Sequence, residues 1–166
     1  MHDARAITNF FLEKAWASQA PITIMTLLKV LYFAHAWYLA KTGKALVGQP
    51  FEAWKHGPVS RVVYEQYKNY GSKPLDKKAV SFDPSALKYV ETPYFIDGEL
   101  EDFLNSVFEY YSKFHPYTLS DLTHEKGAPW DLVWTEAQNR AVPGMVIPNE
   151  LIRSWFLKRD NLYPIN

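Results

Sequence analysis

Helical periodicity dominates the pattern of apolar and polar residues along this chain. Over residues 27–39 apolar and aromatic side chains recur every three or four positions and occupy almost every helical face. This pattern predicts a central helix that is largely buried. Thr23 or Thr26 can cap its start, and Gly43 is a natural left-handed terminator just past its end.

The same spacing predicts further helices on both sides of this one. Residues 99–114 carry apolar side chains at helical intervals behind an acidic first turn, which suits the positive end of a helix dipole. The other predicted helices run from Asp3 to a break at 19–21, from Ser60 to Tyr70, from Thr118 or Ser120 to Gly127, from Pro129 to Asn139, and onward from Pro148.

Extended backbone is predicted in short stretches only. Residues 49–55 alternate loosely between apolar and polar, and Gly57-Pro58 is expected to form the turn that leads into the next helix. Residues 72–98 are the least regular segment, with three prolines, and short strands are expected near 80–82 and 88–90. A long irregular segment in a small domain is often mobile or functional.

Composition agrees with a packed helical domain. The chain has 166 residues, of which 48% are hydrophobic and 22% charged, so it can bury a core and is not disordered. We predict a mostly α fold: a single compact domain over residues 1–166, with six or seven helices and a small extended or β element. Aromatic residues reach 16%, and such side chains dominate both cores and protein interfaces.

Charge and cysteine content exclude several classes of function. The chain has no cysteine, which removes disulfides, thiolate metal sites and a cysteine nucleophile. Its 18 basic and 18 acidic residues give no net charge, so we expect no nucleic-acid partner. No signal peptide is visible, and the most apolar stretch, 22–40, is interrupted by Lys29 and His35. We therefore expect a cytoplasmic protein without a membrane partner.

Catalytic motifs are missing from the sequence. Neither a nucleophile elbow nor a phosphate-binding glycine loop occurs, and no two histidines have the spacing of helical metal ligands. We interpret the histidines as mainly structural, and we expect no enzyme activity, no cofactor and no metal. The alternative that stays open is a small metal-dependent hydrolase in which His35, His56 and His124 converge.

Two segments stand out from ordinary helix patterns. In the first, Trp54, Lys55 and His56 directly precede Gly57-Pro58, which gives either a simple turn or a rigid aromatic and cationic patch for a partner. In the second, residues 119–125 are followed by Pro129-Trp130. Helix packing, with Trp130 filling a corner, is the simpler interpretation of this second segment.

The chain resembles the Panacea domain family of SocA-like antitoxins. The resemblance rests on 29–39 followed by Gly43, on 51–59, on 119–124 with 129–130, and on Ile147-Pro148, all in the family's order. The motif residues that we expect to be structural are Tyr32, His35, Trp37, Gly57, Pro58, Thr123, His124, Pro129 and Trp130.

The resemblance implies a helical antitoxin that neutralises a cognate bacterial or phage toxin by direct protein contact. In one branch of the family the antitoxin is instead an adaptor that delivers its toxin to the ClpXP protease. Some relatives carry an additional N-terminal DNA-binding region, which we do not expect here because the first predicted helix starts near Met1. The residues that we expect to contact a partner are Trp54, Lys55 and His56, together with the segment 72–98.

Overall fold

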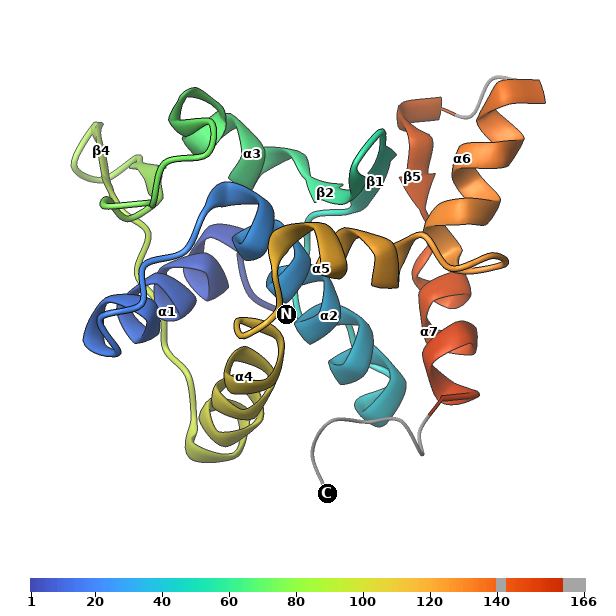
Figure 1. Cartoon of the computed structure of the whole chain (residues 1–166). Coiled ribbons are helices and arrows are strands. Elements are labelled where there is room, and N and C mark those ends of the chain that lie inside the picture. The colour runs from blue at the N-terminus through green and yellow to red at the C-terminus, as the bar shows by residue number, and fades with distance from the viewer. Residues whose placement is uncertain (140–142, 160–166) are drawn as a thin grey trace.

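Seven α-helices and two small antiparallel sheets form the part of the chain that the computed structural model describes, residues 1–139 and 143–159 (Figure 1). The helices are α1 (Ala4–Ala17), α2 (Ile24–Thr42), α3 (Arg61–Tyr67), α4 (Gly98–Tyr111), α5 (Pro116–Thr123), α6 (Pro129–Asn139) and α7 (Asn149–Leu157), with 3-10 turns η1 (Lys68–Tyr70) and η2 (Pro143–Met145). The strands are β1 (Phe51–Trp54), β2 (Gly57–Ser60), β3 (Val80–Asp83), β4 (Lys88–Glu91) and β5 (Val146–Ile147). The fold is therefore mostly α with a small β element, as predicted.

Helix α2 is the central element of the fold, and residues 26–37 are buried without interruption. It packs against α1, α3, α4, α5 and α7, so it has helices on several sides. The Thr23 side chain accepts from the Thr26 amide, and Gly43 ends the helix with φ +70°. Both predicted ends of this helix are confirmed. Among the described helices, none is long and apolar enough to cross a membrane.

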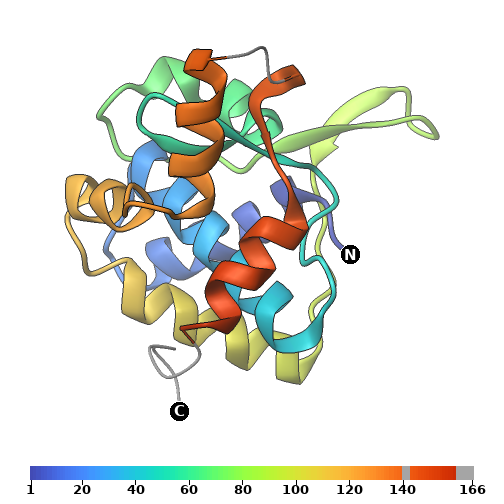
Figure 2. The ribbon, with the colours of Figure 1, turned by 90° about the vertical axis from the view of Figure 1, so that its right-hand side faces the viewer.

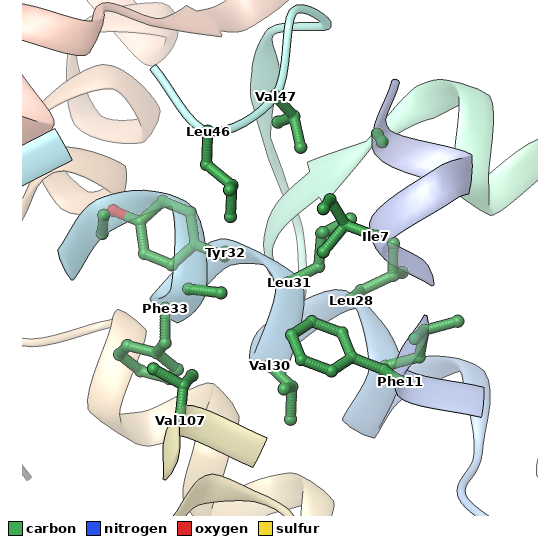
Figure 3. Close-up of a cluster of buried hydrophobic side chains, with 14 of the residues drawn as sticks. Ile7, Phe11, Leu28, Val30, Leu31, Tyr32, Phe33, Leu46, Val47 and Val107 are labelled. Atoms are coloured by element: carbon green, nitrogen blue, oxygen red, sulfur yellow. The ribbon is translucent and has the colours of Figure 1, made fainter. Parts of the chain in front are cut away.

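The hydrophobic core lies between α2 and the helices that pack against it. Figure 3 shows Ile7 and Phe11 of α1 close to Leu28 of α2, while Val107 of α4 lies near Phe33. Aromatic rings supply much of this packing. The rings of Phe33 and Tyr111 stack with centroids 4.1 Å apart, and those of Phe11 and Phe108 stack at 5.7 Å. Part of the high aromatic content therefore lies inside the protein.

The larger sheet has the strand order β2-β1-β5. Strands β1 and β2 pair antiparallel up to Trp54 opposite Gly57, so the turn consists of Lys55 and His56. The predicted turn at Gly57-Pro58 is wrong, because these two residues already belong to β2. Pro58 is tolerated there since β2 is an edge strand, where a missing backbone donor leaves no strand partner unsatisfied.

The segment 72–98 contains a projecting β-hairpin made of β3 and β4 (Figure 2). Both predicted strands are confirmed. Buried Asn9 of α1 fastens the base of this hairpin: its Nδ2 donates to the carbonyls of Ala79 at 3.0 Å and Thr92 at 2.9 Å, and its Oδ1 accepts from the Ala79 amide at 2.7 Å. The beginning of the hairpin is thus anchored on the core while its tip extends away from it.

Three predicted helix boundaries are wrong, and one of them is the end of α5, which lies at Thr123 instead of Gly127. Helix α4 ends at Tyr111, three residues before the predicted end at 114, and α5 begins at Pro116 instead of Thr118 or Ser120. The His115 side chain caps α5 by accepting from the Tyr117 amide at 3.3 Å. Proline fits the first helical position because it needs no amide hydrogen there, so Pro116 starts α5, five residues after the last residue of α4.

Candidate functional site

The β1–β2 hairpin presents Trp54, Lys55 and His56, which we call the tip triad. Lys55 and His56 are exposed at the two turn positions, and Trp54 is half-buried. The Trp54 ring packs edge-on against Tyr64 with centroids 4.8 Å apart. The triad therefore combines a partly exposed indole with two basic side chains at a fixed turn.

Glu52 and Arg61 hold the Trp54 side chain in place. The Trp54 Nε1 donates to one carboxylate oxygen of Glu52 at 2.8 Å, and Arg61 donates to both oxygens at 3.0 and 2.9 Å. Burial favours the neutral form of Glu52, but the hydrogen bonds from Arg61 and Trp54 outweigh it and lower the pKa of this carboxyl. Glu52 is thus an anionic support for the indole at neutral pH.

Three helices fix the backbone of the hairpin by donating to its carbonyl oxygens. Trp130 Nε1 of α6 donates to the Trp54 carbonyl at 2.7 Å, and Ser120 Oγ of α5 donates to the His56 carbonyl at 2.9 Å. Lys29 Nζ of α2 donates to the Pro58 carbonyl at 3.2 Å. We call Lys29, Ser120 and Trp130 the anchor residues. They explain why sequence segments so far apart meet around one turn.

Gly57 is required by the closeness of these anchors. Its φ of +107° is a conformation that residues with a Cβ rarely adopt. A Cβ at this position would lie 2.6 Å from Lys29 Nζ and 2.7 Å from Thr123 Oγ1. The hairpin can therefore approach α2 and α5 only because residue 57 has no side chain.

Lys29 is an unusual buried base. Its side chain is 2% exposed, and burial lowers its pKa to about 7. Its Nζ donates to the carbonyl oxygen of Pro58. The amine can therefore lose its proton near neutral pH, as expected when a charged group is removed from water.

His124 closes the cluster on the side of α6. Its ring stacks on the Trp130 indole with centroids 3.8 Å apart, and its Nε2 is buried without a hydrogen-bond partner among the described residues. Burial and then the neighbouring Lys29 charge lower the pKa of His124. Thr123 donates to the Ser120 carbonyl at 2.7 Å, and Pro129 is the first residue of α6. Thr123, His124, Pro129 and Trp130 are all motif residues of the family resemblance.

His35 lies in a separate, fully engaged position. The Val47 amide donates to its Nδ1 at 3.4 Å, so the neutral ring carries its proton on Nε2, which donates to Asn149 Oδ1 at 3.0 Å. Burial lowers the pKa of His35 and so favours this neutral form. Nowhere within residues 1–139 and 143–159 do three or more histidine and acidic side chains converge on a possible metal position. The hydrolase alternative has no geometric support there.

The remaining motif residues of α2 belong to the core. The Tyr32 ring packs edge-on against Phe51 at 5.3 Å, and the Trp37 ring packs edge-on against Phe156 at 4.8 Å. Trp37 Nε1 also donates to the Tyr111 hydroxyl at 2.8 Å. These two side chains connect α2 to β1, α4 and α7 and are not available at the surface.

An open apolar hollow of about 190 Å³ lies beside the tip triad. It is lined by Ile24, Met25 and Leu28 in the first turns of α2 and, among others, by Trp54 and Val59 of the hairpin. We call this feature the hairpin hollow. It places an apolar recess directly beside the exposed basic turn.

Sequence comparisons relate this chain to one family of proteins. Residues 27–131 match the family model described as "Antitoxin SocA-like, Panacea domain", a span that contains the tip triad and all three anchor residues. The chain belongs to this family. It is 34% identical over 155 residues to "Antitoxin SocA" of Caulobacter vibrioides (strain NA1000 / CB15N), covering 93% of this chain and 82% of that protein. No solved structure matches the chain significantly.

The sequence indicated the tip triad but not the roles of its three anchors. In the sequence, Lys29 interrupts an apolar run, Ser120 is a candidate helix start, and Trp130 is expected to fill a corner between helices. A lysine in the middle of a helix that is apolar on every face was the available signal for Lys29, because such a group must find an acceptor when it is buried. For Ser120 the sequence carries no such signal, since its acceptor lies 64 residues away.

Proposed function

We propose that this chain is the antitoxin of a toxin–antitoxin pair and that it neutralises its toxin by direct contact through the tip triad. Membership of the SocA-like antitoxin family supports the general role. We choose the tip triad as the contact surface because three helices fix this exposed turn. A surface that is already rigid loses little conformational entropy on binding, and tryptophan is enriched at the energetic centres of interfaces.

The direct test is co-expression with the product of the neighbouring gene. The chain should co-purify with that product and restore growth that the product alone prevents. Trp54→Ala and His56→Ala should weaken both effects, whereas Leu157→Ala, which shortens an exposed apolar residue of α7, should leave them unchanged. If the neighbouring product is harmless and does not bind, the proposal is wrong.

A second candidate is delivery of the toxin to the ClpXP protease, which requires a second contact surface. The β3–β4 hairpin offers one, because Phe82 and Tyr89 are 50% and 69% exposed and pack edge-on against each other. This hairpin is separated from β1 in both views of the fold (Figures 1 and 2). Under this candidate, purified ClpXP degrades the toxin only when this chain is present, and Phe82→Ser with Tyr89→Ser reduces that degradation without reducing toxin binding.

A further inference from the structure

The hairpin hollow is large enough for one side chain of a partner. Its volume of about 190 Å³ exceeds the roughly 150 Å³ at which an apolar protein cavity binds a benzene ring. Met25 and Ile24 are partly exposed on its α2 side, so the hollow opens to solvent. It can therefore receive an aromatic or a large aliphatic side chain from outside.

The charges around the hollow have one sign. The basic residues in its lining are Lys29, Lys55 and His56, and no carboxylate lines it. Glu52, the acid on the adjacent strand, is already bound by Arg61 and Trp54. No carboxylate within the described ranges forms an ion pair with the exposed Lys55 amine. An apolar recess with an unpaired cation at its edge is complementary to an apolar group beside an anion.

From this arrangement we infer that the hairpin hollow binds one large apolar side chain of the toxin, and that an aspartate or glutamate next to that side chain pairs with Lys55. This inference rests on the proposed function and specifies the chemistry of the toxin segment. Met25 and Leu28 contact the apolar group, and Lys55 fixes the direction of the segment across the tip triad. The toxin surface recognised is thus acidic with an apolar centre.

A carbodiimide cross-link tests the ion pair directly, because this reagent joins an amine to a carboxylate only when they are in contact. In the complex of the full chain with the co-purified toxin, mass spectrometry should find Lys55 coupled to an aspartate or glutamate beside a large apolar residue. Lys55→Arg should lose the cross-link but keep the affinity within about threefold, because it keeps the charge. Lys55→Glu should lose the cross-link and raise the Kd at least about tenfold at low ionic strength.

The apolar contact in the hairpin hollow is tested by filling the hollow with a larger side chain. Met25→Trp should raise the Kd at least about tenfold, while Lys44→Glu, a charge reversal at an exposed lysine after α2, should change it less than about twofold. Circular dichroism and thermal unfolding check that each variant is folded. If the wild-type chain binds the toxin but Lys55→Glu and Met25→Trp bind equally well, this inference is overturned while the proposed function stands. If the wild-type chain does not bind the toxin, both fall.

Discussion

The indole Nε1 of Trp130 donates to the backbone carbonyl of Trp54 at 2.7 Å, across 76 residues of sequence. This hydrogen bond joins the start of α6 to the last residue of β1 before the turn. Trp130 is buried and also stacks on His124, so the same side chain connects three segments of the molecule. The geometry of the tip triad therefore depends on residues far from it in the sequence.

Trp130→Phe should remove this hydrogen bond while keeping most of the ring packing. We expect the free energy of unfolding to fall by about 1–3 kcal/mol, the range for leaving a buried carbonyl without its donor. Urea denaturation measures it. The matched control is Trp134→Phe, one turn later on α6 and partly buried, which should destabilise the protein clearly less. Equal losses of unfolding free energy in the two variants would mean that the hydrogen bond to Trp54 does not cause the destabilisation.

Gly57→Ala should be among the most destabilising single-methyl changes in this chain. The left-handed φ and the approach to Lys29 and Thr123 act together, and we expect a loss of roughly 2–5 kcal/mol. Gly98→Ala is the control, because a Cβ there meets no atom within 4 Å and the position begins α4. That change should be neutral or slightly stabilising in thermal unfolding. A tolerated Gly57→Ala would contradict the close packing of the hairpin on α2 and α5.

Lys29 should make stability depend on pH. Its pKa is about 7 when folded, against an ordinary value of 10.5, so between these values the unfolded chain binds more protons. The free energy of unfolding should therefore rise with pH over this window, by up to about 1.4 kcal/mol per pH unit from this group. Burial raises the pKa values of Tyr67 and Tyr111 in the fold, so at high pH these tyrosines ionise first in the unfolded chain and add an opposing slope. Denaturation between pH 7 and about 9.5 avoids this ionisation.

Lys29→Met should flatten this dependence, because the substituted side chain does not titrate. Lys44→Met, at a solvent-exposed lysine, should keep the slope of the wild-type chain. The comparison isolates the buried amine from every other titrating group. A wild-type slope that Lys29→Met leaves intact would show that another group causes it.

Asn9→Ala should release the base of the β3–β4 hairpin. It removes three hydrogen bonds with the backbone of Ala79 and Thr92 inside the protein, and we expect a destabilisation of roughly 1–3 kcal/mol. Hydrogen exchange should show faster exchange over residues 79–92, with little change in α2. Uniform protection across the hairpin in the variant would contradict the anchoring role of Asn9.

Local rules predicted most of the fold, because helix periodicity and caps depend on residues that are close in sequence. Asp3, Thr23 and Gly43 occupy the ends predicted for them. The errors fell where two rules compete at one residue. Proline breaks the interior of a helix but fits its first position, where Pro116 stands in α5. Gly57-Pro58 has the composition of a turn although pairing of Gly57 with Trp54 places it in a strand.

The site could be predicted only in part, since its geometry comes from long-range contacts. The tip triad was visible as an unusual cluster in one short segment. Its anchors were not, because the acceptor of Lys29 is 29 residues away and those of Ser120 and Trp130 are further still. Periodicity places a residue on a helix face but does not identify the carbonyl that it meets.

Neutralisation by direct contact is tested most directly by a calorimetric titration of the purified toxin into this purified chain. Toxin activity is followed in the same mixtures, with no protease present. We expect a saturable complex with a submicromolar Kd and loss of toxin activity in proportion to the complex formed. The contradicting result is that the co-expressed chain protects cells although the two purified proteins do not bind and the toxin stays active. Neutralisation by direct contact would then be wrong.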